Sequence, residues 1–386
     1  MATPQGTDVS VILNEIRQTA SNAYQDSVPL ATADNIKDVG ERVLSLPDPI
    51  MNEFMQNLVN KIGLTLVDYP VVNNHLSFLK KGRLEYGQVI EDIYVELAQA
   101  EPYITGMSDG EYPDPFKIHK VPHRSAFYHT ILSRQYPLTR HISDLRKAFH
   151  GSTSMEQFIG GMMNAITSRE AYDDYRMTVA LMARQIEEAV DADEHNGRVQ
   201  LLTLFNAQVD EDEQVDETNA FSSKRFLQFF TNQLKKWSGR MTYLREDLNI
   251  AGVPNLTPQS QQRIMMPDDI LVDFDTQLLA WAQNDGYLQI GGVDKIDAWY
   301  SIGAEAEGEE GVTVSPDDIT VKSTFTEDGS QCVGVIYDPQ MAKIYNKEHI
   351  NSTQENAAGN YWNLFTSVED IYAASPYRNF VYFTLD

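Results

Sequence analysis

Two histidines with the spacing of metal ligands are the first candidates for chemistry in this sequence. His119 and His123 lie four residues apart, which would place two imidazole rings on one face of a helix. Pro122 lies between them and the flanking residues are typical of a strand, so a shared helical face is not expected. We therefore predict that this pair holds no metal ion.

Paired carboxylates are the second candidate, because hard divalent cations prefer oxygen ligands. The acidic run from Asp210 to Glu217 lacks the glycine and the terminal glutamate of a calcium loop, so a solvated loop explains it better. Four close pairs are interpreted as exposed faces, loops or, for Asp275, a helix cap: Asp173-Asp174, Asp268-Asp269, Asp273/Asp275 and Asp317-Asp318. Nothing in the sequence selects one pair as the acid and base of a glycosidase.

Nucleophilic and nucleotide chemistry lack their usual motifs here. No glycine-rich segment ends in Gly-Lys-Ser or Gly-Lys-Thr, and no serine stands in a nucleophile elbow. Cys332, the only cysteine, lies in an apolar run and is expected to be packed rather than reactive. We predict no enzymatic activity and no cofactor, and we expect the function to lie in how copies of the chain fit together.

The composition is that of a globular protein with a strong acidic bias. The chain has 386 residues, of which 42% are hydrophobic and 22% charged, enough for two or three domains. No apolar run reaches about 18 residues and the chain opens on polar residues, so neither a membrane span nor a signal peptide is expected. The net charge of −26 argues against binding a nucleic-acid backbone. A single cysteine excludes an intrachain disulfide and favours a reducing compartment.

Two extended runs predict a long β-arm. From Leu84 to Leu97, β-branched and aromatic residues alternate with charged ones, which is the pattern of a strand. A second extended run covers Phe116 to Leu132, and Ser108-Asp109-Gly110 provides a turn between the two. A two-stranded arm is only marginally stable by itself. We therefore expect it to lie on a neighbouring subunit.

Helical periodicity predicts the elements that would support this arm. Apolar residues recur every three or four positions from Ser154 to Val190, which predicts a helix on the order of 50 Å long. Shorter helices are predicted at Val11–Ala20, Ile36–Val43, Ile50–Ile62 and Phe226–Trp237. Strands are predicted at Asp269–Val272, Gln331–Tyr337, Ile344-Tyr345 and Arg378–Thr384, with an acidic surface loop at 304–311 and 316–329. The second half therefore looks like a mixed sheet with helices against it.

Several segments resemble, in order and spacing, the major capsid proteins of small podophages of the phi twenty-nine type. The resemblance is clearest from Ser27 to Leu132, where Phe127-Tyr128-His129-Thr130-Ile131 is similar to the segment that closes the arm in those proteins. The long helix comes where their spine helix comes. Three later segments keep the same order: Val335-Ile336-Tyr337-Asp338, Tyr361-Trp362-Asn363 and Phe380-Val381-Tyr382-Phe383. About half of the chain is covered, and residues 195–330 match weakly.

This resemblance implies an α+β fold of the Hong Kong 97-like type, shared by the major capsid proteins of tailed phages and herpesviruses. Its parts are an N-terminal arm, an extended hairpin called the E-loop, a peripheral domain with the spine helix, and an axial domain. On this sequence the N-terminal arm is placed at 1–45, the E-loop at 80–132, the peripheral domain at 46–79, 133–200 and 360–386, and the axial domain at 201–359. The extra immunoglobulin-like module of some family members is not expected.

The resemblance also implies a structural protein rather than an enzyme. Copies would self-assemble into hexamers and pentamers of an icosahedral or prolate bacteriophage head that encloses double-stranded DNA without sequence-specific binding. The implied partners are a scaffolding protein during assembly, a portal or connector, and head fibres, with no membrane. Assembly would occur in the cytoplasm of the host bacterium, and the protein would become part of the virion. An acidic inner wall would keep DNA from adhering, although solubility alone also explains the charge.

Basic residues gather on the predicted arm of an otherwise acidic chain. We hypothesise that they contact carboxylates on the spine helix of the next subunit. The basic group comprises Lys80, Lys81, Arg83, Lys117, Lys120 and Arg124, and the acidic group comprises Asp173, Asp174, Glu187 and Glu188. Each exposed pair would contribute only ~0–1 kcal/mol, but its repetition at every copy would fix the register of assembly. The alternative is a basic patch that faces water.

Two other functions remain open from the sequence. A nanocompartment shell protein of the encapsulin-like type would have the same fold and would enclose a cargo enzyme. An acidic soluble metal-dependent hydrolase is less consistent with the residues. Particles that hold a tagged cargo peptide would favour the first, and a monomer that binds a divalent metal and turns over a substrate would favour the second.

Overall fold

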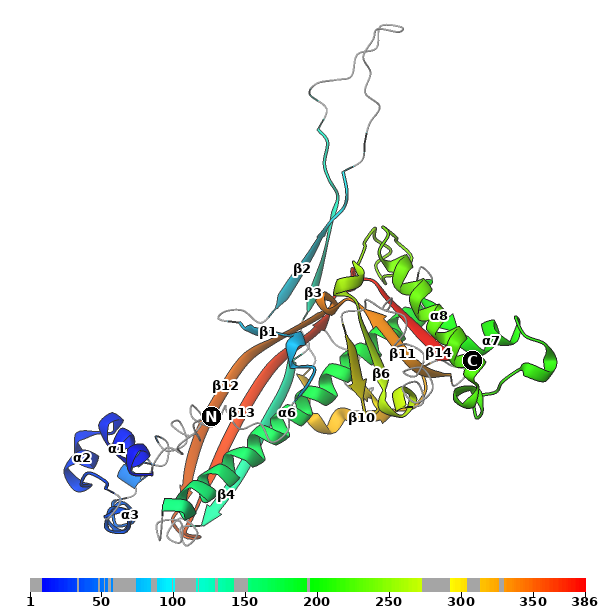
Figure 1. Cartoon of the computed structure of the whole chain (residues 1–386). Helices are drawn as coiled ribbons and strands as arrows, with labels where there is room; N and C mark the ends of the chain where they lie inside the picture. The colour runs from blue at the N-terminus through cyan, green and yellow to red at the C-terminus, as the bar shows by residue number, and fades with distance from the viewer. Residues whose placement is uncertain are drawn as a thin grey trace, which may run out of the picture. The chain divides into compact units, whose positions relative to one another are not determined.

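The computed structural model divides into two compact units (Figure 1). Unit 1 comprises Met1–His75, Leu132–Tyr175 and Asn346–Asp370, and unit 2 comprises Leu76–Ile131, Arg176–Tyr345 and Ile371–Asp386. The residues described are 9–32, 35–47, 49–51, 53–54, 57, 74–84, 89–98, 100, 116, 118–128, 131–141, 152–192, 195–272, 292–303, 313–325 and 330–386.

Unit 1 begins with a small helical module. Its helices are α1 (Val9–Thr19), α2 (Asn22–Ser27) and α3 (Ile36–Leu44). The first and third confirm the helices that apolar spacing predicts at Val11–Ala20 and Ile36–Val43. Val28 is extended, as the following Pro29 favours, and its carbonyl accepts a hydrogen bond from Arg17 Nε at 2.7 Å.

The helical module has its own hydrophobic core. Tyr24 and Phe54 are fully buried and stack with their ring centroids 6.0 Å apart. Trp362, from a strand far along the chain, lies in the same cluster and is only 2% exposed. Of the helix predicted at Ile50–Ile62, the described residues from Ile50 to Phe54 are helical, and residues 58–62 lie outside the described part of the chain.

One long helix and three strands also contribute to unit 1. α6 (Ser152–Asp191) has 40 residues, about 60 Å at ~1.5 Å per residue, and confirms the helix predicted at Ser154–Val190. The strands β12 (Ala342–Asn356), β13 (Tyr361–Ala374) and β4 (Ile131–His141) are neighbours in that order. Asn360 takes a positive φ of 51° in the tight connection between β12 and β13, a conformation that asparagine tolerates better than most residues.

Unit 2 is built on a five-stranded sheet. Its order is β5 (Arg198–Gln200), β14 (Phe380–Leu385), β11 (Gln331–Tyr337), β6 (Arg263–Pro267) and β7 (Val293–Ile296). β11 is antiparallel to β14 and β6, whereas β5 is parallel to β14 and β7 is parallel to β6. The mixed sheet predicted for the second half of the chain is therefore confirmed.

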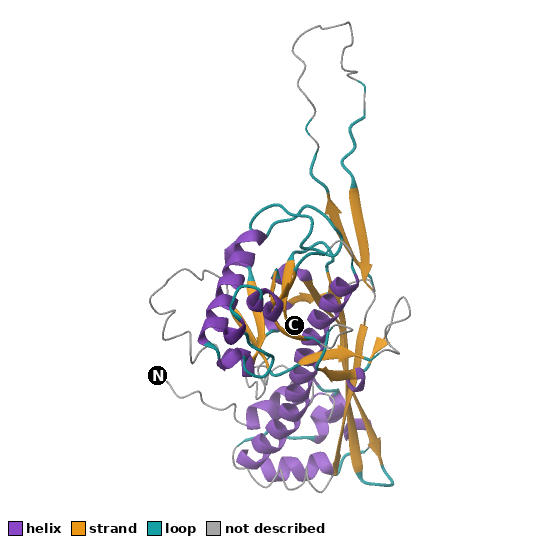
Figure 2. Cartoon of the chain, turned by 90° about the vertical axis from the view of Figure 1, so that its right-hand side faces the viewer, coloured by secondary structure: helices purple, strands orange, loops and turns teal. Residues whose placement is uncertain are grey.

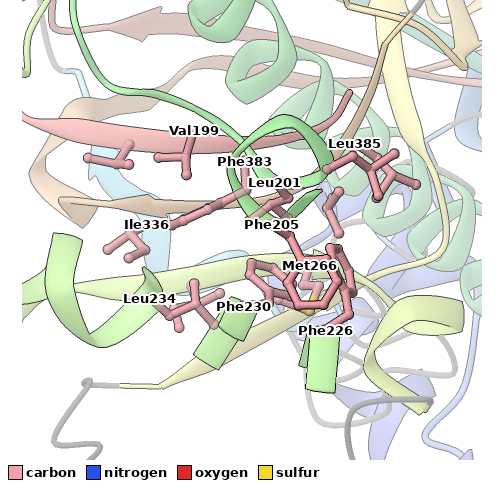
Figure 3. Close-up of a cluster of buried hydrophobic side chains, with 14 of the residues drawn as sticks. Val199, Leu201, Phe205, Phe226, Phe230, Leu234, Met266, Ile336, Phe383 and Leu385 are labelled. Atoms are coloured by element: carbon pink, nitrogen blue, oxygen red, sulfur yellow. The ribbon is translucent and has the colours of Figure 1, made fainter. Parts of the chain in front are cut away.

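Two helices pack on this sheet and enclose the core of unit 2. They are α7 (Leu201–Asn206) and α8 (Lys224–Met241), whose apolar stripe is the one predicted at Phe226–Trp237. Figure 3 shows Phe205 and Phe226 from the helices close to Phe383 and Ile336 from the strands. Phe230 lies with its ring centroid 5.4 Å from that of Phe383. These aromatic contacts fix α8 against β14.

Short elements complete the described part of the chain. β8 (Trp299–Ile302) pairs antiparallel with β10 (Ile319–Lys322). The remaining strands include β1 (Lys80–Arg83) and β9 (Thr313–Val314). The 3-10 turns are η2 (Ser77–Leu79), η3 (Glu211–Glu213), η4 (Ala220–Ser222), η5 (Gln259–Gln261), η7 (Pro316–Asp318) and η8 (Pro339–Met341).

Two sequence predictions in this region are wrong. The strand predicted at Asp269–Val272 is helical, as residues 268–272 all are. A run of three apolar residues, Ile270 to Val272, does not distinguish a strand from a helix, and the acidic residues directly after Pro267 favour a first helical turn. The loop predicted at 316–329 contains β10, whose Val321 pairs with Tyr300.

Candidate inter-subunit surface

β2 (Ile90–Val95) and β3 (His123–Tyr128) form an antiparallel ribbon in unit 2, which Figure 2 shows as a pair of strands. The ladder is shorter than the predicted runs, because β3 ends at Tyr128 and β4 begins at Ile131. Residues 101–115, which include the predicted turn, lie outside the described residues. We call β2, β3 and the described residues between them the arm.

One face of the arm is polar and binds unit 2. The register places Tyr94 opposite Arg124, with Asp92 two residues away on the same face. Asp92 Oδ2 accepts a hydrogen bond from Ser375 Oγ at 2.5 Å, and Asp92 Oδ1 lies 3.6 Å from Lys343 Nζ. The ribbon is therefore attached to its own unit through charged and hydrogen-bonding side chains.

The opposite face of the ribbon is exposed and carries three large apolar side chains beside Glu91, Ser125 and His123. The side chains of Ile93, Val95 and Phe127 are between 56% and 60% exposed. Further along the arm, other large apolar residues are exposed as well: Leu97, Phe116, Ile118 and Val121. Exposed large apolar side chains gathered along one ribbon are typical of a surface that another molecule covers.

The basic residues predicted for the contact lie at the root and along the arm. Lys80, Lys81 and Arg83 are all on β1, and the last two are exposed. Partial burial of the Lys81 ammonium, together with the nearby Lys343 and Arg378, lowers its pKa, whereas Asp338 raises it. Three basic residues thus lie on the four-residue strand β1, which we call the basic root of the arm.

Of the other three basic residues predicted for the contact, two lie within the part of the chain that the structure describes. Lys120 is exposed in the arm. Arg124 donates from Nε to Glu96 Oε1 at 3.2 Å and from Nη1 to the Ala251 carbonyl at 2.9 Å, so its guanidinium already binds groups of its own chain. Lys117 lies outside the described residues.

Two of the predicted acidic partners are held inside unit 1. Asp173 is fully buried and accepts hydrogen bonds from Tyr136 and from Arg169, both at 3.0 Å. Asp174 lies 2.5 Å from Arg134 Nη1. Contact of either carboxylate with another subunit stays a prediction, and for Asp173 it would require the side chain to leave a buried site.

Arg134 is the centre of this buried network. Its guanidinium is completely buried and donates to Asp174 through Nη1 and to Asp370 through Nη2. Asp370 Oδ1 also accepts from Asn346 Nδ2 at 2.8 Å. The network therefore connects α6 to β4, β12 and β13 within unit 1.

The other two predicted acids lie further along α6, in unit 2. Glu187 forms an ion pair with Lys322. Glu188 accepts from Arg184 Nε at 3.1 Å and from Gln185 Nε2 at 2.7 Å. All four acidic residues thus have partners in their own chain.

The candidates for catalytic chemistry find structural explanations. Among the described residues, no three or more His, Cys, Asp and Glu side chains form a group that could hold a metal ion. Burial raises the pKa of the Cys332 thiol to about 12 and keeps it protonated. Asp318 closes a capping box with Ser315. Asp273 and Asp275 lie outside the described residues.

A search for membrane-spanning helices within the described ranges finds none that is long and apolar enough to cross a bilayer.

The arrangement of these elements defines the class of protein. A chain in the capsid structure of Staphylococcus phage Andhra matches with a TM-score of 0.56 at 13% identity, covering 83% of this chain and 86% of that one. A chain in the structure of the head fibre and inner core protein of bacteriophage P68 gives a TM-score of 0.55 at 11% identity, with 82% and 86% covered. The fold is the α+β major capsid fold of tailed phages, as the resemblance implied.

The sequence identifies the family more narrowly. Residues 13–384 match the model of the Phi29-like phage major capsid proteins, and the chain belongs to this family. The major capsid protein of Bacillus phage PZA is 24% identical over 380 residues, which are 96% of this chain and 72% of that protein. That of Streptococcus phage Cp-1 is 27% identical over 282 residues, 71% of each chain.

Family membership decides between the functions that the sequence left open. The chain is a structural protein of a bacteriophage head and not an enzyme, and it belongs to the virion capsid. Copies assemble into the shell of the head. Neither a nanocompartment shell protein nor a metal-dependent hydrolase is favoured, because the matched relatives are named major capsid proteins.

Proposed function

We propose that copies of this chain join into hexamers and pentamers of an icosahedral or prolate head through the arm, whose apolar face lies on a neighbouring copy. The observation that carries this proposal is the orientation of the ribbon. Its polar face is bound to its own unit, and Ile93, Val95 and Phe127 on the other face are exposed. A half-buried ribbon ordinarily turns its apolar face to a core, and a second copy would supply that core.

The expected free energies favour a contact that is weak between two copies and becomes strong when it is repeated throughout a shell. Complete burial of a Val, Ile or Phe side chain contributes ~1.5–3 kcal/mol. The exposed side chains of the arm would gain a part of that, and each association costs the freedom of two molecules. In a closed shell every copy provides one arm and receives another, so the contacts reinforce one another through their high effective concentration.

Replacing Ile93 and Phe127 with lysine should abolish shell assembly and leave the folded chain intact. Both side chains are more than half exposed, so folding loses little, whereas the contact with the next copy would have to bury two charges. Electron microscopy and sedimentation of the protein, expressed with its candidate scaffolding protein, measure the outcome. The matched control places lysine at Val293 and Val321, exposed residues of β7 and β10, and should give normal shells. Normal shells from the arm variant would contradict the proposal.

We also propose that the basic root of the arm fixes the register of this contact. Lys81 and Arg83 are exposed, and the surrounding protein carries a net charge of −26. Because Asp173, Asp174, Glu187 and Glu188 have partners in their own chain, they would have to exchange them to serve as the acidic side, and other exposed carboxylates compete for that role. Each pair contributes ~0–1 kcal/mol.

Reversal of the charge at Lys81 and Arg83 to glutamate should stop assembly or slow it strongly. The change introduces repulsion at every arm contact of the shell, and added salt should partly relieve it. Light scattering during assembly at two salt concentrations follows the effect. The same change in charge at Lys224 and Lys236, both exposed on α8, provides the control. Equal assembly rates for the two variants would show that the basic root plays no part.

The division of the chain implied by the resemblance belongs to this proposal. β2 and β3 fall within the E-loop at 80–132, α6 within the peripheral part at 133–200, and β6, β7 and β11 within the axial part at 201–359. The helices α1–α3 fall within the N-terminal arm at 1–45, and β14 within 360–386.

The finer partners are supported by family membership alone. A scaffolding protein would guide assembly in the host cytoplasm, and a portal or connector and head fibres would join the shell. Packaged DNA would be enclosed without sequence-specific contacts, which agrees with the acidic net charge of the chain.

A further inference from the structure

The base of the arm rests on two loops of unit 2, and we propose that these loops fix the direction in which the arm points. The loops are the turn at 249–255 and the segment at 375–379, and we call them together the bracket. The hydrogen bonds that carry the proposal join the bracket to Asp92, Tyr94 and Arg124 of the arm. They are positioning residues, because they act through the apolar face that the arm presents and not by touching the partner themselves.

Two of the contacts attach the two strands at the same position along the ribbon. Tyr94 Oη donates to the Pro254 carbonyl at 2.5 Å, and its ring stacks on Tyr377 with the centroids 5.4 Å apart. Arg124 Nη1 donates to the Ala251 carbonyl at 2.9 Å. Tyr94 and Arg124 are direct partners in the β2–β3 ladder. Because one attachment is on each strand, the ribbon is held against rotation about its own axis.

The third contact lies lower on the ribbon. Asp92 Oδ2 accepts from Ser375 Oγ at 2.5 Å, and Tyr128 Oη lies 3.4 Å from the same oxygen. Asp92 is two residues from Tyr94, which is ~7 Å along a strand. Three attachments that do not lie on one line define a plane, so they also fix the tilt of the ribbon relative to unit 2.

The bracket itself is rigid because two buried asparagines tie it together. Asn249 and Asn379 are both fully buried, and Asn249 Nδ2 donates to Asn379 Oδ1 at 3.0 Å. Asn249 also bonds both the carbonyl and the N–H of Val253, at 2.7 and 2.9 Å. Asn379 Nδ2 donates to the Asn255 carbonyl at 3.0 Å. The carbonyls that receive the arm are therefore held in place by neutral amides.

The backbone of the turn adds to this rigidity. Gly252 has a φ of 59°, in the left-handed region that glycine adopts without strain. The Ala251 N–H donates to the Pro376 carbonyl at 3.1 Å, which joins the turn to the second loop of the bracket. The acceptor at Ala251 is thus fixed from both sides before the arm binds it.

A fixed direction matters because a rotation at the bracket would displace the exposed apolar side chains of the ribbon, and a closed shell requires the same geometry in every copy. This consequence rests on the proposed contact of the arm with a second copy. The position of the arm on its own unit does not depend on that contact, and it can be measured on the unassembled chain.

The test is a distance measurement by pulsed electron paramagnetic resonance on the full, unassembled chain. Spin labels are attached to cysteines that replace His123 on the arm and Lys236 on α8, both in unit 2 and both exposed. The native Cys332 is buried and stays unlabelled. The parent should give one narrow distance distribution. Tyr94→Phe combined with Arg124→Met should broaden it, because both upper attachments are lost while the aromatic ring and the aliphatic stem remain.

A matched control and a milder variant keep the test decisive. Tyr243→Phe combined with Arg225→Met changes the same residue types at exposed positions of unit 2 and should leave the distribution narrow. Tyr94→Phe alone removes a single hydroxyl and is expected to fold in any case, with a smaller broadening. An unchanged narrow distribution in the Tyr94/Arg124 variant overturns the inference.

Assembly of the same variants separates this inference from the proposed function. A broadened distribution together with irregular or missing shells supports both. A broadened distribution with regular shells supports the bracket and counts against the arm as the contact between copies.

Discussion

Replacement of Arg134 with methionine is expected to destabilise unit 1 by about 3–5 kcal/mol. The guanidinium is completely buried and neutralises Asp174 and Asp370, the second of which is also completely buried. Removing the cation leaves two carboxylates in a site from which water is excluded, and each then lacks its strongest partner. Chemical denaturation of the unassembled chain, followed by circular dichroism, measures the loss.

A second change should recover much of this stability. Combining Arg134→Met with Asp370→Asn removes the buried charge with its partner, and a neutral amide can still accept the hydrogen bond from Asn346. The control is Arg184→Met on α6, whose ion pair with Glu188 is exposed on both sides and should contribute at most ~0.5 kcal/mol. If Arg134→Met and Arg184→Met cost the same, the buried network does not hold α6 against the strands of unit 1.

The long helix and the sheet of unit 2 could be predicted because their signals are local. Apolar residues of α6 recur at spacings of three and four from Phe158 to Ile166 and again from Tyr172 to Val190, so no tertiary information is needed to predict the helix. β11 is an apolar run bounded by polar residues, which fits a buried central strand. The apolar run at 270–272 has only three residues, so neither its length nor its period distinguishes a strand from a helix, and the strand prediction there is wrong.

The partners of the acidic residues on α6 could not be predicted in the same way. Asp173 and Asp174 look like an exposed acidic pair on a helix, because Arg169, four residues before Asp173, is a local partner for only one of them. Their partners include Arg134, about forty positions earlier in the sequence, on a strand that folding brings alongside. Ion pairs between distant segments leave no local pattern, so a charged pair in a sequence reads as solvated until the fold is known.

For the arm, the sequence pattern predicts a strand with two different faces, but it does not show which face lies against the chain's own unit. Alternation in β2 separates Asp92 and Tyr94 from Ile93 and Val95, as expected for a strand with two different faces. The usual inference places the apolar face against the chain's own core. Here the carbonyls of Ala251 and Pro254, far along the sequence, receive the polar face instead. The outward apolar face is the feature from which the contact between copies is inferred.

Replacement of Trp362 with alanine is expected to have the other large effect, and a local one. Trp362 is 2% exposed and shares a hydrophobic cluster with residues of the helical module, including Ile16, Tyr24 and Phe54. Truncation of a buried tryptophan costs about 3–5 kcal/mol. Among the described residues of that cluster, Trp362 is the one contributed by a strand, so the loss should fall on the attachment of α1, α2 and α3.

Hydrogen exchange measured by mass spectrometry can resolve this effect by segment. In Trp362→Ala, peptides from α1 and α3 should exchange faster, whereas peptides from β11 and β14 in unit 2 should keep their protection. The control is Leu364→Ala, because Leu364 is buried two residues further on the same strand but belongs to a different cluster, with Ile166. Unchanged exchange in α1 and α3 of Trp362→Ala would mean that the helical module is stable without the strand. Faster exchange confined to the module would instead show that this one indole holds the N-terminal helices to β13, so that the start of the chain can detach without unfolding the rest.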